Sequence, residues 1–245
     1  LMMAYNYLNS QDVNSIEAEI TGDAFAFNAA LGNVNDDVLA NSKYGDQHRI
    51  IGVGSKKWNY ANDKWATTVS AFFEYAKGGR FNYTYGGDIN GDGSNLNDLL
   101  YIPTSSEIGE MQFSEPGQGA AFDAYIAQDD YLNGRRGQYA ERYGAISPWR
   151  GRLDLKILQD YNIKINENRT NTLQFSLDIL NVGNMINSDW GVMQQPNNVQ
   201  PIGVTVDPGT NTPTYTFNPD LKETFGYDTS LASRWQAQFG LRYIF

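Results

Sequence analysis

The stretch Arg234-Trp235-Gln236-Ala237-Gln238-Phe239-Gly240-Leu241-Arg242-Tyr243-Ile244-Phe245 decides the fold class of this chain. Its odd-numbered positions are apolar throughout, whereas Arg or Gln occupies most of the even-numbered ones. Alternation with a period of two predicts a β-strand with different environments on its two faces. An apolar, aromatic-ended face opposite Arg and Gln over about ten residues is typical of a transmembrane barrel strand, with lipid outside and water inside.

The same alternation predicts five further strands. With the last one, they cover approximately residues 1–9, 48–58, 65–75, 152–165, 173–179 and 234–245. Leu158 and Gln159 interrupt the alternation in the middle of the fourth strand. We expect the six strands to form one curved antiparallel sheet, because their apolar positions fit one register. The residues expected on its outer, convex face are Val69, Phe73, Leu155, Ile157, Phe175, Leu177, Phe239 and Leu241.

The lengths of the connections predict the topology. Residues 59–63 and 166–169 form short polar joins, and the other three joins are long. Outer-membrane barrels have short periplasmic turns and long extracellular loops, so the sixth strand is expected to end at the periplasmic face. Six strands are fewer than the roughly eight that close the smallest barrels, so the rest of the wall is expected N-terminal to Leu1. The predicted fold is therefore all-β: residues 1–245 are about six C-terminal strands of one larger antiparallel transmembrane β-barrel domain with long extracellular loops.

The long connections contain structure of their own. A short helix is expected around residues 120–127, and residues 202–206 and 214–217 are expected to pair as a surface hairpin across Asp207-Pro208-Gly209. Structured loops longer than about 15 residues are usually functional.

Composition excludes several classes of function. The net charge of −10 disfavours a nucleic-acid partner. The chain has no cysteine, one histidine (His48) and no Gly-x-Ser-x-Gly motif, so we expect no enzyme. No stretch approaches the roughly 20 apolar residues of a transmembrane helix, so any membrane crossing must use strands.

The sharpest local motif is Asp88-Ile89-Asn90-Gly91-Asp92-Gly93-Ser94-Asn95-Leu96-Asn97-Asp98. Alternating Asp and Asn followed by a glycine wrap a chain around Ca²⁺, which takes several oxygen ligands. The expected ligands are the side chains of Asp88, Asn90, Asp92 and Asp98, with a main-chain carbonyl at Ser94. The twelfth position is Leu99 instead of Glu, and the alternative is a turn whose side chains cap their own backbone.

The single histidine and the tryptophans have structural explanations. His48-Arg49 is expected to have a structural role at the top of a strand. Trp58, Trp65, Trp149 and Trp235 lie near strand ends and favour an interfacial girdle over a sugar-binding platform. Trp190 lies in a loop, where contact with a ligand is the alternative to a structural role.

Several segments together resemble the C-terminal part of Oar-like TonB-dependent outer-membrane receptors, distant relatives of the SusC glycan importers. The segments that carry the resemblance are Tyr44-Gly45-Asp46-Gln47-His48-Arg49, Tyr85-Gly86-Gly87-Asp88-Ile89-Asn90-Gly91-Asp92-Gly93, Asn97-Asp98-Leu99-Leu100-Tyr101-Ile102-Pro103, Pro148-Trp149-Arg150 with Asp154, Asn181-Val182-Gly183-Asn184-Met185-Ile186-Asn187, Trp190-Gly191, and Arg242-Tyr243-Ile244-Phe245. The resemblance implies a 22-stranded barrel that is plugged by an N-terminal domain and imports nutrients with energy relayed by TonB.

Two functions are therefore open: part of an energy-coupled nutrient importer, or part of a barrel that serves as a surface anchor or adhesion protein. The implied partners of the importer are the N-terminal strands and plug of the same receptor, TonB through the N-terminal part, outer-membrane lipid and a surface lipoprotein. The implied location is the outer membrane of a Gram-negative bacterium. A plug and a TonB-binding segment N-terminal to Leu1 would favour import.

Overall fold

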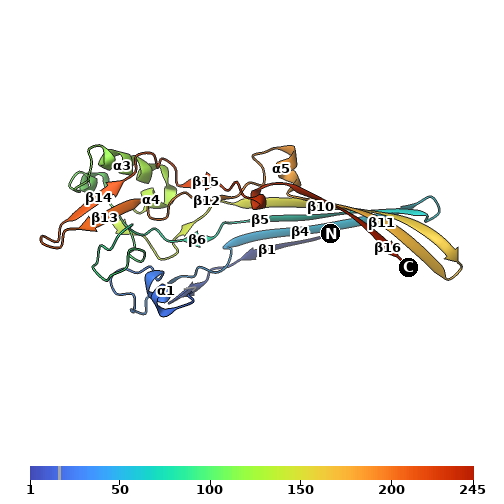
Figure 1. The fold of residues 1–245 in the computed structure, drawn as a ribbon, viewed down its shortest axis with the longest axis horizontal. Helices are drawn as coiled ribbons and strands as arrows, with labels where there is room; N and C mark the ends of the chain where they lie inside the picture. Colours follow the sequence, from blue (N-terminus) through green and yellow to red (C-terminus); the bar gives the residue numbers. More distant parts are fainter. Residues whose placement is uncertain (16–17) are drawn as a thin grey trace.

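The computed structural model describes residues 1–15 and 18–245, and its largest element is a six-stranded antiparallel sheet (Figure 1). The strands stand in the sheet in the order in which they occur in the chain. They are β1 (Met2–Tyr7), β4 (His48–Tyr60), β5 (Trp65–Ala76), β10 (Arg150–Asn166), β11 (Arg169–Leu180) and β16 (Gln236–Ile244). The prediction of a mostly β chain with six long antiparallel strands is confirmed.

The register places all eight residues of the expected outer face on one side of the sheet. Phe175 pairs with Leu241 and Leu177 with Phe239. Leu177 also pairs with Ile157, which in turn pairs with Val69. Directly paired residues of antiparallel strands project to the same face. Strand β10 runs through Leu158 and Gln159 without a break, and its register shift lies between Lys164 and Asn166.

The connections alternate as the sequence predicts. Residues 61–64 and 167–168 form tight turns at one end of the sheet, and all three long connections lie at the other end (Figure 1). We call the unit formed by the described residues of these connections, 8–15, 18–47, 77–149 and 181–235, the loop head.

The loop head contains short elements only. Its strands are β2 (Gln11–Asp12), β3 (Ala40–Asn41), β6 (Arg80–Phe81), β7 (Tyr101–Ile102), β8 (Gln138–Tyr139), β9 (Ala145–Ile146), β12 (Gln194–Pro196), β13 (Ile202–Val206), β14 (Pro213–Phe217) and β15 (Phe225–Tyr227). Its helices are α1 (Thr21–Ala26), α2 (Ser105–Ile108), α3 (Gln118–Gln128), α4 (Asp130–Gly134), α5 (Val182–Ile186) and the 3₁₀ turn η1 (Leu231–Ser233). The expected helix corresponds to α3, and the expected hairpin is formed by β13 and β14. Among the described residues, no helix is long and apolar enough to cross a membrane.

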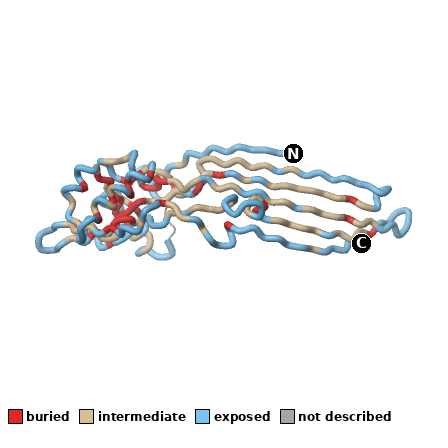
Figure 2. The backbone as a smooth tube through the Cα atoms, turned by 90° about the horizontal axis from the view of Figure 1, so that it is seen from above, coloured by how far each residue is buried: buried red, intermediate tan, exposed pale blue. Residues whose placement is uncertain are grey.

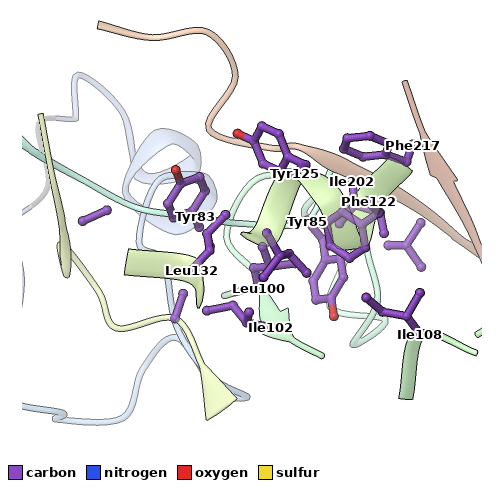
Figure 3. Close-up of a cluster of buried hydrophobic side chains, with 14 residues drawn as sticks. Tyr83, Tyr85, Leu100, Ile102, Ile108, Phe122, Tyr125, Leu132, Ile202 and Phe217 are labelled. Atoms are coloured by element: carbon purple, nitrogen blue, oxygen red, sulfur yellow. The ribbon is translucent and has the colours of Figure 1, made fainter. Parts of the chain in front are cut away.

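The main hydrophobic core of the protein lies in the loop head and not on the sheet (Figures 2 and 3). Phe122 of α3 and Phe217 of β14 are 0% and 1% exposed, and their ring centroids are 5.3 Å apart. The other members of the cluster come from residues 77–149 and 181–235: Tyr83, Tyr85, Leu100, Ile102, Ile108, Tyr125, Ile126, Leu132, Ala140, Ala145, Ile202 and Val204. These two connections therefore fold as one unit, which the alternation of the strands does not predict.

A buried carboxylate links the same two connections. Asp129 accepts hydrogen bonds from the Thr224 hydroxyl at 2.6 Å and the Tyr83 hydroxyl at 3.1 Å. The Leu132 N–H donates to its other oxygen at 2.8 Å. The Thr224 hydroxyl also accepts a bond from the Gln128 amide at 2.8 Å. Burial, together with the nearby Tyr125 and Asp129, raises the pKa of Tyr83, so its hydroxyl stays protonated and remains a donor.

We expect Thr224→Val to destabilise the loop head by about 1–3 kcal/mol, because at nearly unchanged volume it removes the shortest hydrogen bond to the buried Asp129 carboxylate. Hydrogen exchange of loop-head amides measures the effect. Thr205→Val, at an exposed position of β13, is the control and should leave exchange unchanged. Equal exchange in the two variants would contradict a stabilising role for this network.

Candidate functional site

One face of the sheet is apolar and open to its surroundings. We call it the apolar face; it carries Phe175, Leu241 and their register partners. Phe239 is 80% exposed, and Phe175, on an interior strand, is 49% exposed. A soluble sheet covers such a face with a second layer, because apolar surface in water costs about 25 cal/mol per Å². The apolar face therefore has the character of a surface that contacts something other than water.

Aromatic side chains form two bands on the apolar face, one near each end. At the turn end, register places Tyr60, Trp65, Tyr161 and Tyr243 in one row across the sheet. The band nearest the loop head is formed by Tyr5, Tyr7, His48, Tyr75 and Trp149, with Trp149 stacked on Tyr75 at 4.8 Å.

The separation of the two bands matches an apolar layer. Trp65 and Tyr75 are ten residues apart on one strand, or about 34 Å at the usual strand rise. With the tilt of about 40° of barrel strands, the bands would be roughly 25 Å apart, which is the height of the apolar band of outer-membrane barrels.

The opposite face, which we call the polar face, carries a ladder of paired charges. Lys156 contacts Asp178 at 2.7 Å, and Arg49 contacts Glu74 at 2.7 Å. Asp160 is only 8% exposed, and its carboxylate accepts hydrogen bonds from Lys57 and Gln174. Charged groups are thus satisfied and partly buried on this face while aromatic rings stay exposed on the other, the reverse of the arrangement in soluble proteins.

Between the two aromatic bands, three polar residues depart from this pattern on the apolar face: Lys56, Thr67 and Gln159. Thr67 donates a hydrogen bond to Gln159 at 2.7 Å, and Tyr60 donates to the same amide oxygen at 3.2 Å. The Lys56 ammonium lies 5.5 Å from the centre of the Trp58 ring, towards the turn end. Thr67 and Gln159 therefore satisfy each other, and the long Lys56 stem carries its charge towards the aromatic band.

The 88–98 segment lies in the loop head, and its outer half is organised around Asp88. One Asp88 oxygen accepts from the Gly91 N–H at 2.7 Å and the Asp92 N–H at 3.1 Å, and the other accepts from the Gly93 N–H at 2.8 Å. Gly91 and Gly93 have φ values of 77° and 94°, in the left-handed region that glycine adopts readily. These bonds are those of a turn that caps its own backbone. Asp88 Oδ2 accepts only the Gly93 bond and retains a second lone pair for a cation, whereas Oδ1 already accepts two bonds.

Three side chains in the second half of the segment are buried, whereas Asn95 and Leu96 are exposed. Ser94, Asn97 and Asp98 are 5%, 1% and 4% exposed. Burial raises the pKa of the Asp98 carboxyl, with further smaller contributions from Asp92 and Asp88, whereas hydrogen bonds from backbone N–H groups act in the opposite direction. The Asp92 and Asp88 carboxylates are therefore close enough to disfavour the charged form of Asp98.

Hydrogen bonds connect Asp92 to Asp88, Asn90 and Ser94 of the predicted calcium ligands, and a further polar side chain of the segment, Asn97, also contacts Asp92. The Asn97 amide nitrogen donates to Asp92 Oδ2 at 3.1 Å, while the buried Asn97 Oδ1 has no partner. The sequence shows that Asn97 lies within the motif. Its burial depends on packing and cannot be read from the sequence. Among the described residues, no three His, Cys, Asp or Glu side chains are arranged to hold a metal by themselves.

The expected structural role of His48 agrees with its surroundings. Its Nδ1 shares a hydrogen bond of 2.8 Å with the Tyr5 hydroxyl, and its ring stacks on Trp149 at 5.8 Å. Trp58 and Trp65 lie at the turn end of the sheet, and Trp149 and Trp235 directly precede β10 and β16. Trp190, 56% exposed, lies in the loop head.

Comparison with protein-family models, with curated proteins and with solved structures found no match for this chain.

Proposed function

We propose that this chain forms part of the wall and the surface loops of an outer-membrane β-barrel, and that this barrel is a TonB-dependent receptor that imports a nutrient. The observation that carries the wall proposal is the inverted character of the sheet. Exposed aromatic and aliphatic side chains cover one face, and paired charges cover the other. Lipid in contact with the apolar face and water in contact with the polar face would suit the side chains of each face.

The edges of the sheet support a larger wall. Among the described residues, β1 pairs only with β4 and β16 pairs only with β11 in this sheet, so each has one free edge. Unpaired backbone groups in hydrocarbon cost several kcal/mol each. We therefore propose that strands outside these 245 residues pair with both edges and complete a barrel of about 22 strands.

Import is proposed from the resemblance described above, and it brings further partners with it. These are a plug domain inside the barrel, TonB acting through the N-terminal part of the receptor, and a surface lipoprotein that contacts the loop head. The other candidate, a surface anchor or adhesion barrel, shares the same wall. The gene sequence upstream of the Leu1 codon discriminates the two, since an importer requires a plug and a TonB-binding segment.

Labelling of single cysteines on intact cells tests the wall proposal. These 245 residues contain no cysteine, so Glu115→Cys in the loop head and Asn168→Cys in a short turn each introduce one exposed thiol. A membrane-impermeant maleimide should label the first on intact cells and the second only after the outer membrane is permeabilised. Labelling of both thiols on intact cells, or of neither, would contradict the proposed orientation.

A further inference from the structure

We propose that the 88–98 segment binds one Ca²⁺ ion, that the Asn97 amide oxygen is one of its ligands, and that the ion clamps the three long connections of the loop head together. The proposal rests on loop-head contacts and does not require the sheet to lie in a membrane.

The first argument is the set of donors. Asp88, Asn90, Asp92 and Asp98 supply side-chain oxygens, and Ser94 supplies a main-chain carbonyl. Ca²⁺ takes six to eight oxygen ligands of mixed carboxylate, amide and carbonyl type. The ion pairs found among the described residues all involve other carboxylates, so no Lys or Arg side chain there pairs with Asp88, Asp92 or Asp98.

The second, independent argument is the state of Asn97. Its side chain is 1% exposed, its Nδ2 lies 3.1 Å from Asp92 Oδ2, and its Oδ1 has no hydrogen-bond partner. A buried polar atom without a partner destabilises the folded protein. Nδ2 is the atom that faces Asp92, so a half-turn of the amide about its Cβ–Cγ bond would bring Oδ1 to that position, where a cation bound by Asp92 would be its missing partner.

The third argument is the opening of the site. Asn90, Gly91, Asp92 and Gly93 are exposed, whereas Asn97 and Asp98 are buried beneath them. An ion can therefore enter from solvent and contact an inner wall that is already held by the fold. This arrangement reduces the ordering that ion binding requires.

The clamping role follows from the neighbours of the segment. In the first connection, the Ala30 N–H donates to the Asn97 carbonyl at 2.8 Å, and the Leu99 N–H donates to the Ala30 carbonyl at 3.1 Å. In the third connection, the Gln200 amide donates to the Asn95 carbonyl at 2.9 Å. Residues of all three connections thus meet at the segment, so an ion that fixes it also fixes their junction.

Calorimetric titration of the chelator-treated full-length protein in detergent with CaCl₂ tests the binding. We expect saturation at one ion per chain, and at least a tenfold loss of affinity in Asp92→Asn and Asn97→Ala. Glu115→Gln removes an exposed acid from the same connection and should bind as the wild type does. Absence of saturable binding, or equal affinity in Asp92→Asn and Glu115→Gln, would overturn the proposal.

Asn97→Asp distinguishes loss of a calcium ligand from loss of folding. The variant keeps an oxygen that can bind calcium but adds a negative charge beside Asp92. We expect this variant to exchange loop-head amides faster than wild type without calcium and to recover protection when calcium is added. In the wild type, calcium should slow exchange at Ala30 and Leu99. Binding without any change in exchange at these amides would overturn the clamping role. Neither the titration nor the exchange measurement depends on where the protein lies in the cell.

Discussion

Arginine in place of Leu177 is expected to remove most of the protein from the outer membrane, whereas arginine in place of Leu158 is expected to be tolerated. Leu177 lies on the apolar face between the two aromatic bands, where it pairs with Ile157 and Phe239. An arginine near the middle of a bilayer on the lipid side of a barrel costs about 2–4 kcal/mol. The amount of folded protein in isolated outer membranes, read from its heat-modifiable mobility, measures the effect.

Leu158 provides the matched control, because it is the same residue type on an adjacent strand. It pairs with Ser176 and Thr68 on the polar face. Asp160 and Asp178 lie on that face as well, so an arginine there gains favourable charge partners. If Leu177→Arg and Leu158→Arg assembled equally well, the apolar face would not face lipid. A sheet with water on both faces predicts that result, because both leucines are half-buried on its surface and would lose similar packing when replaced by arginine.

The 245-residue chain expressed alone in water is expected to yield no soluble monomer. The apolar face would be uncovered, with Phe239 and Leu241 80% and 67% exposed. The free edges of β1 and β16 would also present rows of unpaired N–H and C=O groups, which template pairing with further chains. Association through the edges and the apolar face should therefore produce aggregates.

Size-exclusion chromatography with light scattering and circular dichroism after refolding checks this expectation. The same chain in detergent micelles is the control, because detergent covers the apolar face but not the edges. We expect more strand content and less aggregation there than in water. A monodisperse, strand-rich monomer with a cooperative unfolding transition in plain buffer would replace the outer-membrane proposal with a soluble β domain.

The sequence by itself determined the sheet. Alternation along 234–245 and along residues such as Leu155 and Ile157 identifies strands and their faces because side chains of a strand point to opposite sides in turn. The face of each residue then follows from register, which the short turns at 61–64 and 167–168 set locally. Helix α3 and the β13–β14 hairpin were predictable for the same reason, since their signals lie within a few neighbouring residues.

Only the tertiary structure decided how the loop head is built. Phe122 and Phe217 meet across 95 residues, and Thr224 donates to Asp129 across the same distance along the chain. No local period marks such pairs, because they depend on how irregular segments pack and not on the direction of successive side chains. The 88–98 segment contains features of both kinds. The spacing of Asp88, Asn90 and Asp92 is visible in the sequence. The unpartnered oxygen of Asn97 results from burial, which only packing creates.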